Sequence, residues 1–216
     1  MTKSKTLKQV LGLYLFIFLV WGIYRYFFQL PPIIEQTILK PLIWLLPLFW
    51  LIKSEKKFFT SIGWSLKNLF KSLYLGIGLG IVFAFEGLLI NNLKYGEFHF
   101  TKLPFSTPDL LLLALGLAFV GAISEETVFR GFIFTRLQIV FKNEWLANIL
   151  SSVAWTLIHL PVALIILQYP LEQMAVYLLL VFIFGFASCL VYGRTGTIAA
   201  SILLNVFWSW PINLFR

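Results

Sequence analysis

The sequence is poor in the residues that build several common kinds of site. Its 216 residues include one cysteine, Cys189, and one aspartate, Asp109, with two histidines and no H-E-x-x-H motif. A lone cysteine forms no internal disulfide, and zinc sites usually use three or four Cys, His or carboxylate ligands. A single aspartate also excludes an aspartyl dyad. We therefore expect no metal and no other cofactor, and keep open only one metal-ligand set, Glu125, Glu126 and His159.

Charge is scarce as well: 12% of the residues are charged and 60% are hydrophobic. Soluble domains carry about 25% charged residues, and about 20 apolar residues suffice to cross a bilayer as a helix. We predict an all-α, polytopic membrane helix bundle of about seven transmembrane helices, forming a single transmembrane domain over 1–216. The apolar runs are 7–30, 33–52, 70–90, 109–133, 145–167, 171–192 and 196–215. An eighth helix arises if the 145–167 run breaks at Pro161.

The net charge of +8 lies at the ends of the apolar runs, so we expect a lipid bilayer and no nucleic acid as the partner. With the N-terminus cytoplasmic, twelve basic residues fall on the inner side and five on the outer side, which favours that orientation. The outer five are Arg25, Lys40, Lys94, Lys102 and Arg216. The basic start resembles a signal peptide, but the first alanine is Ala84, so we expect a retained first helix.

Two further patterns concern helix packing. Residues 58–72 alternate apolar and basic side chains at helical spacing, which predicts an interfacial helix on the inner surface. Gly76 and Gly80 form a G-x-x-x-G pair, which favours close packing of two helices.

Three ionisable residues interrupt the fourth apolar run: Glu125, Glu126 and Arg130. A charge near the centre of a membrane helix costs roughly 3 kcal/mol, so such a cluster requires a function or a partner. On a helix, Glu126 and Arg130 are i,i+4 neighbours and are expected to form a structural ion pair. Glu125 points about 100° away, which leaves it free for another task.

Two later runs carry polar residues that would face the same interior. His159 follows Trp155 by four residues and shares a helical face with Ser152 and Thr156. The last run has a polar residue at every fourth position: Thr197, Ser201, Asn205, Ser209 and Asn213. Such a stripe should face the bundle interior or water, although ordinary interhelical hydrogen bonding also explains it.

Together these motifs resemble the CPBP family of intramembrane proteases, which includes the CAAX prenyl endopeptidases, bacteriocin-processing and self-immunity proteins, and Abi-type proteins. The likeness covers about 108–215 and implies a bacterial, multi-pass membrane protein. The motifs, in order, are Glu125-Glu126-x-x-x-Arg130, Trp155-x-x-x-His159 and Arg194-Thr195-Gly196-Thr197.

The resemblance also assigns roles to residues. It implies that Glu125 and His159 hold and activate water. Where the family usually has a second histidine and an asparagine that stabilise the oxyanion, this chain has Asn205 and Ser209. Both residue types can donate hydrogen bonds to an oxyanion, so we expect them to take that role.

The sequence thus favours a glutamate-type, metal-independent endopeptidase that cleaves a membrane-embedded or lipidated peptide. The altered third motif keeps open a non-catalytic membrane regulator or scaffold that binds a partner. A small transporter with Glu125 as a proton relay is a third reading, although transporters often show inverted repeats and this chain shows no repeat.

Overall fold

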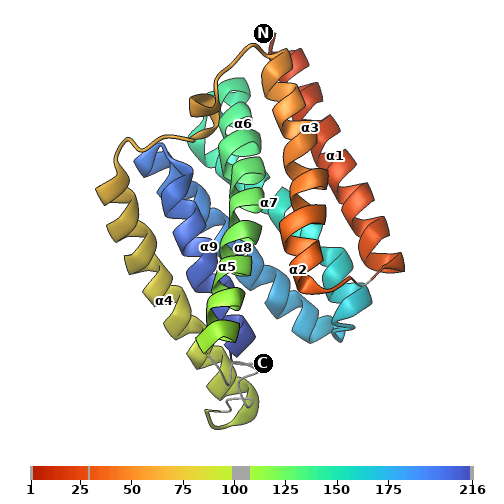
Figure 1. Ribbon diagram of the computed structural model, residues 1–216, viewed down its shortest axis with the longest axis vertical. Coiled ribbons are helices and arrows are strands. Elements are labelled where there is room, and N and C mark those ends of the chain that lie inside the picture. Colours follow the sequence, from red (N-terminus) through yellow and green to blue (C-terminus); the bar gives the residue numbers. More distant parts are fainter. Residues whose placement is uncertain (1, 29, 99–107, 215–216) are drawn as a thin grey trace.

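The computed structural model describes residues 2–28, 30–98 and 108–214, and every regular element in these ranges is a helix (Figure 1). The helices pack side by side as one bundle, which confirms the all-α prediction. In chain order they are α1 (Lys3–Phe27), α2 (Pro32–Ile34), η1 (Glu35–Leu39), α3 (Lys40–Ser54), η2 (Phe59–Ile62), α4 (Leu69–Tyr95), α5 (Pro108–Glu126), η3 (Thr127–Phe134), α6 (Thr135–Phe141), α7 (Glu144–Pro161), η4 (Val162–Ile166), α8 (Leu171–Thr195) and α9 (Ile198–Leu214).

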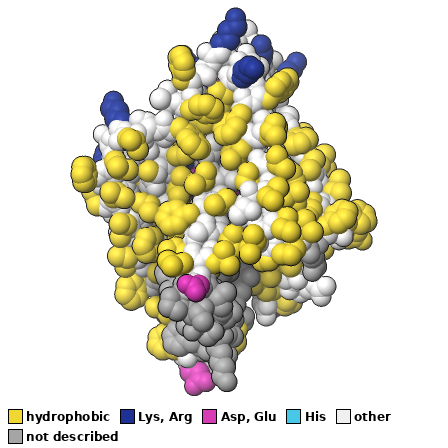
Figure 2. All heavy atoms as spheres, in the orientation of Figure 1, with side chains coloured by type: hydrophobic (Ala, Val, Ile, Leu, Met, Phe, Trp, Pro, Cys, Tyr) yellow, Lys and Arg dark blue, Asp and Glu magenta, His cyan; other side chains and the backbone are white. Residues whose placement is uncertain are grey.

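Six helical stretches in the described ranges are long and apolar enough to cross a membrane, and a seventh, shorter apolar stretch spans Ile198–Ser209. Large hydrophobic side chains cover the face shown in Figure 2, as expected of a surface in contact with lipid. Lysine and arginine gather at the end of the molecule where the N-terminus lies. The protein is therefore an integral, multi-pass membrane protein.

The fifth apolar run does not break into two spans. Pro161 lies inside one continuous helical stretch, Glu144–Ile166, so this run contributes no eighth helix to the described structure. Proline removes a backbone hydrogen bond from a helix, and the wider π-helical segment η4 begins at the next residue.

Three of the helices contain a π-helical segment next to a polar residue. The segment η1 immediately precedes Lys40, η3 immediately follows Glu126, and η4 begins three residues after His159. Such π-helical segments within α-helices are frequently found at functional sites.

The close packing predicted for Gly76 and Gly80 is confirmed. A Cβ atom at Gly76 would lie 2.9 Å from the carbonyl oxygen of Ala200, and one at Gly80 would lie 2.6 Å from Cβ of Phe207. The two glycines thus let α4 pack directly along α9. That contact fixes the position of α9, which carries Asn205.

The interfacial helix predicted for residues 58–72 is wrong. A short 3₁₀ turn, η2, ends at Gly63, whose φ of +79° is left-handed, and α4 begins only at Leu69. Ile62 is fully buried, and its carbonyl oxygen would lie 2.6 Å from a Cβ at Gly131. The Trp64 indole donates to Oγ1 of Thr127 at 3.2 Å. The segment is therefore anchored to the bundle by the buried Ile62 and by the hydrogen bond of Trp64, which itself stays partly exposed.

Four basic residues counted as loop charges instead belong to ion pairs within the bundle. Arg25 pairs with Glu35, while Lys40, Arg130 and Arg136 are buried and each contacts a carboxylate. Without these four, ten basic residues remain on the expected inner side and three on the outer side. The expected inner side therefore still carries more basic residues than the outer side.

Candidate active site

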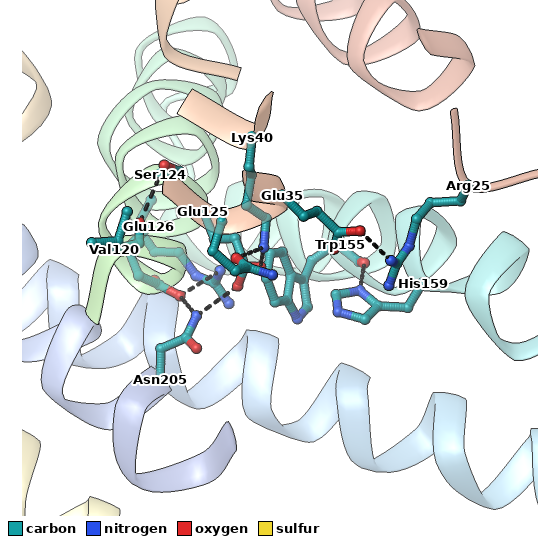
Figure 3. A network of polar contacts seen from close by, with 12 residues as sticks. Arg25, Glu35, Lys40, Val120, Ser124, Glu125, Glu126, Trp155, His159 and Asn205 are labelled. Carbon is teal, nitrogen blue, oxygen red and sulfur yellow. Dashed lines mark hydrogen bonds and ion pairs between the residues drawn. The ribbon is translucent and has the colours of Figure 1, made fainter. Parts of the chain in front are cut away.

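The last residue of α5, Glu126, lies at the centre of a buried polar network (Figure 3). The Arg130 guanidinium donates to its Oε1 at 3.1 Å, as the i,i+4 spacing leads one to expect. The Asn205 amide donates to the same oxygen at 2.7 Å, and the Ser188 hydroxyl donates to Oε2 at 2.8 Å. Three helices therefore meet at this carboxylate: the continuous helix formed by α5 and η3, and the helices α8 and α9.

Arg130 is enclosed by the bundle. Its Nη2 donates to the carbonyl oxygen of Gly185 at 3.3 Å, and its guanidinium carbon lies 4.6 Å from the Trp155 ring centre and 5.4 Å from that of Phe184. A cation this close to aromatic rings is stabilised by their electron-rich faces. These contacts support a structural role for the ion pair.

The helix position of Glu125 predicts that it is free of partners, and this prediction is wrong. Its Oε1 forms an ion pair with the Lys40 ammonium, and its Oε2 accepts from the Asn205 amide at 3.0 Å (Figure 3). Lys40 also donates to Oε1 of Gln36 at 3.2 Å. A Cβ at Gly121 would lie 2.7 Å from that oxygen, so a larger residue there would require the end of the Gln36 side chain to move.

Lys40 and Glu35 are site residues that the sequence reasoning missed. Both lie inside the 33–52 apolar run, where a charge is as costly as at Glu125. The Lys40 side chain is 7% exposed, and Glu35 accepts from Arg25 at 2.6 Å and from the Tyr24 hydroxyl at 3.1 Å. Their position inside an apolar run was the sequence signal that could have identified both as site residues.

Asn205 bridges the two glutamates. Its amide nitrogen has two hydrogens, and these point at Oε2 of Glu125 and Oε1 of Glu126. Ser209, one turn further along α9, donates to the carbonyl oxygen of Val206 at 3.5 Å. Thr197, Ser201 and Asn205 of the polar stripe are buried, as predicted, while the side chain of Asn213 lies outside the described part of the structure.

His159 lies on α7, half-buried, with its ring 4.5 Å from that of Trp155. Its Nδ1 lies 2.9 Å from the Trp155 carbonyl oxygen. A carbonyl only accepts, so Nδ1 carries the hydrogen, and in the neutral ring Nε2 keeps a lone pair. The ring is thereby oriented as a hydrogen-bond acceptor through Nε2.

Two cavities meet at Glu125 and Lys40. A cleft of about 690 Å³ runs between η1, α5 and α9, and its walls include Asn205 and Ser209. A smaller cavity of about 120 Å³ is lined by Glu125, Lys40 and His159. The volume of this smaller cavity leaves room for water, which needs roughly 10–15 Å³ per molecule on this measure.

The metal-ligand set kept open from the sequence does not form in the described residues. No group of three His, Cys, Asp or Glu side chains there converges as metal ligands would. The donors around Glu125 and Glu126 are instead nitrogen and hydroxyl groups that carry hydrogens. These donors fit carboxylates rather than a cation.

Comparison with protein-family models matches residues 107–211 to the family described as type II CAAX prenyl endopeptidase Rce1-like. Comparison with curated proteins and comparison with solved structures each gave no match. The matched segment contains Glu125, Glu126, Arg130, His159 and Asn205, which the fold brings to one buried network and the two cavities beside it. This match, which covers just under half of the chain, supports membership of the CPBP/CAAX family of intramembrane proteases.

Proposed function

We propose that the protein is a glutamate-dependent, metal-independent endopeptidase that hydrolyses a peptide segment in the membrane. The observation that carries this proposal is the position of Glu125, which forms part of the wall of both cavities. One cavity is a cleft of about 690 Å³, within the size range of ligand-binding pockets, and the other has room for water beside His159. A base between substrate and water is the arrangement that hydrolysis requires.

The reaction proceeds through a tetrahedral intermediate. Glu125 takes a proton from water, the water oxygen bonds to the carbonyl carbon, and the π electrons move to the carbonyl oxygen. Protonated Glu125 then gives its proton to the amide nitrogen, which leaves with the electron pair of the C–N bond. The new carboxylic acid releases a proton to the amine, so the products are a carboxylate and an ammonium. Nε2 of His159 accepts a hydrogen bond from the water and orients it.

The remaining roles follow from the contacts. Glu126 and Arg130 hold α5, α8 and α9 together, so they position Glu125 without touching the peptide. Asn205 and Ser209 line the cleft and are the oxyanion donors expected from the sequence. To donate to the oxyanion, Asn205 must break its hydrogen bond to one of the two glutamates. The Ser209 hydroxyl must break only its hydrogen bond to a backbone carbonyl oxygen.

The proposed substrate is an apolar or lipidated peptide. The lining of the cleft extends from Glu125 past Leu113, near the start of α5, to Leu30 in the α1–α2 connection and Pro32 at the start of α2. This end of the bundle lies opposite the N-terminus (Figure 1). If the N-terminus is cytoplasmic, as the charge bias favours, the peptide enters from the outer half of a bacterial cell membrane. Residues 1–216 act as one transmembrane domain in this proposal.

The test compares wild type with Glu125→Gln in lipid nanodiscs. The probes are quenched-fluorescent peptides with a farnesylated cysteine, the same peptides without the lipid, and a single-span apolar peptide. Wild type should cleave at least one of them, Glu125→Gln should cleave none, and EDTA should leave the wild-type rate unchanged. Glu172→Gln makes the same chemical change at an exposed residue of α8 and should keep full activity.

A non-catalytic regulator is the second candidate, and one observation favours it. All four carboxylate oxygens of Glu125 and Glu126 already have hydrogen-bond or ion-pair partners, as in a purely structural cluster. In that case wild type cleaves none of the probes, and Glu125→Gln complements a deletion strain as well as wild type does. This pair of results would refute the proteolytic proposal.

A further inference from the structure

We propose that Lys40 is a catalytic residue of this site: its ammonium donates a hydrogen bond to the carbonyl oxygen of the scissile peptide as that oxygen becomes an anion. The inference rests on the proposed endopeptidase function and assigns the electrophilic group of that reaction. Lys40 lies outside the segment 107–211 that matches the protease family, so this role comes from the structure of the first half of the chain.

The position of the ammonium supports this role. Lys40 is buried at the start of α3 and lines both the cleft and the smaller cavity, and its Nζ contacts Glu125. The rings of Trp21 and Trp44 lie 5.6 Å and 5.4 Å from Nζ, close enough for cation–π attraction. The charge is therefore held at the point where the peptide and the water must meet.

Hydrogen-bond capacity also supports it. An ammonium has three N–H groups, and the described contacts of Lys40 use two, one to Glu125 and one to Gln36. The third is available to a ligand in either cavity. By contrast, both amide hydrogens of Asn205 point at the glutamates.

The other cations of this region are committed elsewhere. Arg130 donates to Glu126 and to a backbone carbonyl, and it lines neither cavity. Arg25 lines both cavities but pairs with Glu35 and has no contact with Glu125 among the described residues. An oxyanion donor must lie about 3 Å from the developing charge, which forms next to Glu125. Lys40 is the cation that meets this requirement in the described structure.

Charge balance gives the physical reason for a lysine here. At rest the site holds one positive charge on Lys40 and one negative charge on Glu125. When Glu125 takes the proton from water, the negative charge moves to the carbonyl oxygen of the peptide. The ammonium then follows that charge over a short distance. No uncompensated charge arises in the low-dielectric interior at any point of this step, which lowers its barrier.

The first experiment measures turnover of the peptide that wild type cleaves in nanodiscs. Lys40→Met should lower kcat by about 100-fold or more while KM changes little, because the lost interaction forms only in the transition state. A Lys40→Met protein whose kcat stays within about threefold of wild type would overturn the inference and leave the endopeptidase proposal standing. If wild type cleaves none of the peptides, the endopeptidase proposal itself fails.

A second experiment separates chemistry from folding, because Lys40→Met strands the Glu125 carboxylate. A Glu125→Gln background removes the carboxylate that Lys40→Met would otherwise strand. The ligands are a phosphinate analogue of the cleaved peptide, which carries the charge of the intermediate, and the uncleaved amide peptide. Adding Lys40→Met should weaken phosphinate binding about 100-fold and amide binding by no more than about threefold. Equal weakening of both ligands would show that Lys40 is only structural.

The matched control removes a different buried pair. Arg136 contacts Glu55 at 2.7 Å, both side chains are buried, and neither lines either cavity. Arg136→Met combined with Glu55→Gln should therefore leave the ratio of phosphinate to amide affinity at its wild-type value. A change in that ratio would mean that general loosening of the bundle explains the Lys40 effect.

Discussion

Loss of Arg130 should destabilise the protein more than loss of any surface charge. The Arg130→Ala change leaves the Glu126 carboxylate buried, with only Ser188 and Asn205 as neutral donors. Breaking a buried pair in this way costs about 3–5 kcal/mol of unfolding free energy. For a chain of this length each kcal/mol lowers the midpoint of thermal unfolding by about 2–4 °C, so we expect a decrease of about 6–20 °C.

The assay is thermal unfolding in detergent, followed by tryptophan fluorescence. Trp155 is a suitable reporter because its ring centre lies 4.6 Å from the guanidinium carbon of Arg130. The control is Arg194→Ala, which breaks the pair with Glu144 at the surface, where the side chains are 57% and 33% exposed. Exposed pairs contribute about 1 kcal/mol or less, so this midpoint should move little.

A double variant tests the stated cause. Arg130→Met combined with Glu126→Gln removes both charges at once and should recover more than half of the stability lost in Arg130→Ala. If Arg130→Ala lowers the midpoint no further than Arg194→Ala does, the buried pair does not hold the bundle together and the reasoning is refuted.

Two further predictions concern α9 and the orientation. Asn205→Asp places a third carboxylate against Glu125 and Glu126, so its unfolding midpoint should fall further than that of Asn205→Ala; the reverse order would show that Asn205 does not donate to both. A reporter fused after Lys57 should be cytoplasmic and one fused near Tyr95 should be outside, because of the charge bias. Opposite labelling would remove the outer-entry proposal.

Much of the fold could be predicted from the sequence because the bilayer imposes a length on every helix. The apolar runs correspond to the helical stretches of the described residues, and the spacing of Glu126 and Arg130 anticipates their contact. The buried Thr197, Ser201 and Asn205 follow from four-residue spacing. Each of these inferences depends on local periodicity alone.

The partner of Glu125 could not be predicted in the same way. Lys40 lies 85 residues before it, and no local pattern relates positions so far apart. We placed Lys40 in an outer loop because it lies near the start of an apolar run, although its burial shows that it belongs to the site. The prediction for residues 58–72 was wrong for a related reason: a helical pattern of apolar residues does not reveal whether they face lipid or the bundle, and Ile62 is buried in the bundle.

The π-helical segment η3 has a consequence for sequence alignment. A π turn holds one residue more than an α turn over the same rise, and one residue corresponds to about 100° of rotation. A relative whose equivalent helix is α-helical throughout would therefore align with this chain only if one residue between Thr127 and Phe134 is left unmatched. Arg130 lies inside this window, so motif spacings counted across it differ by one between the two kinds of helix. Positions compared without that gap would pair lipid-facing residues of one protein with core-facing residues of the other.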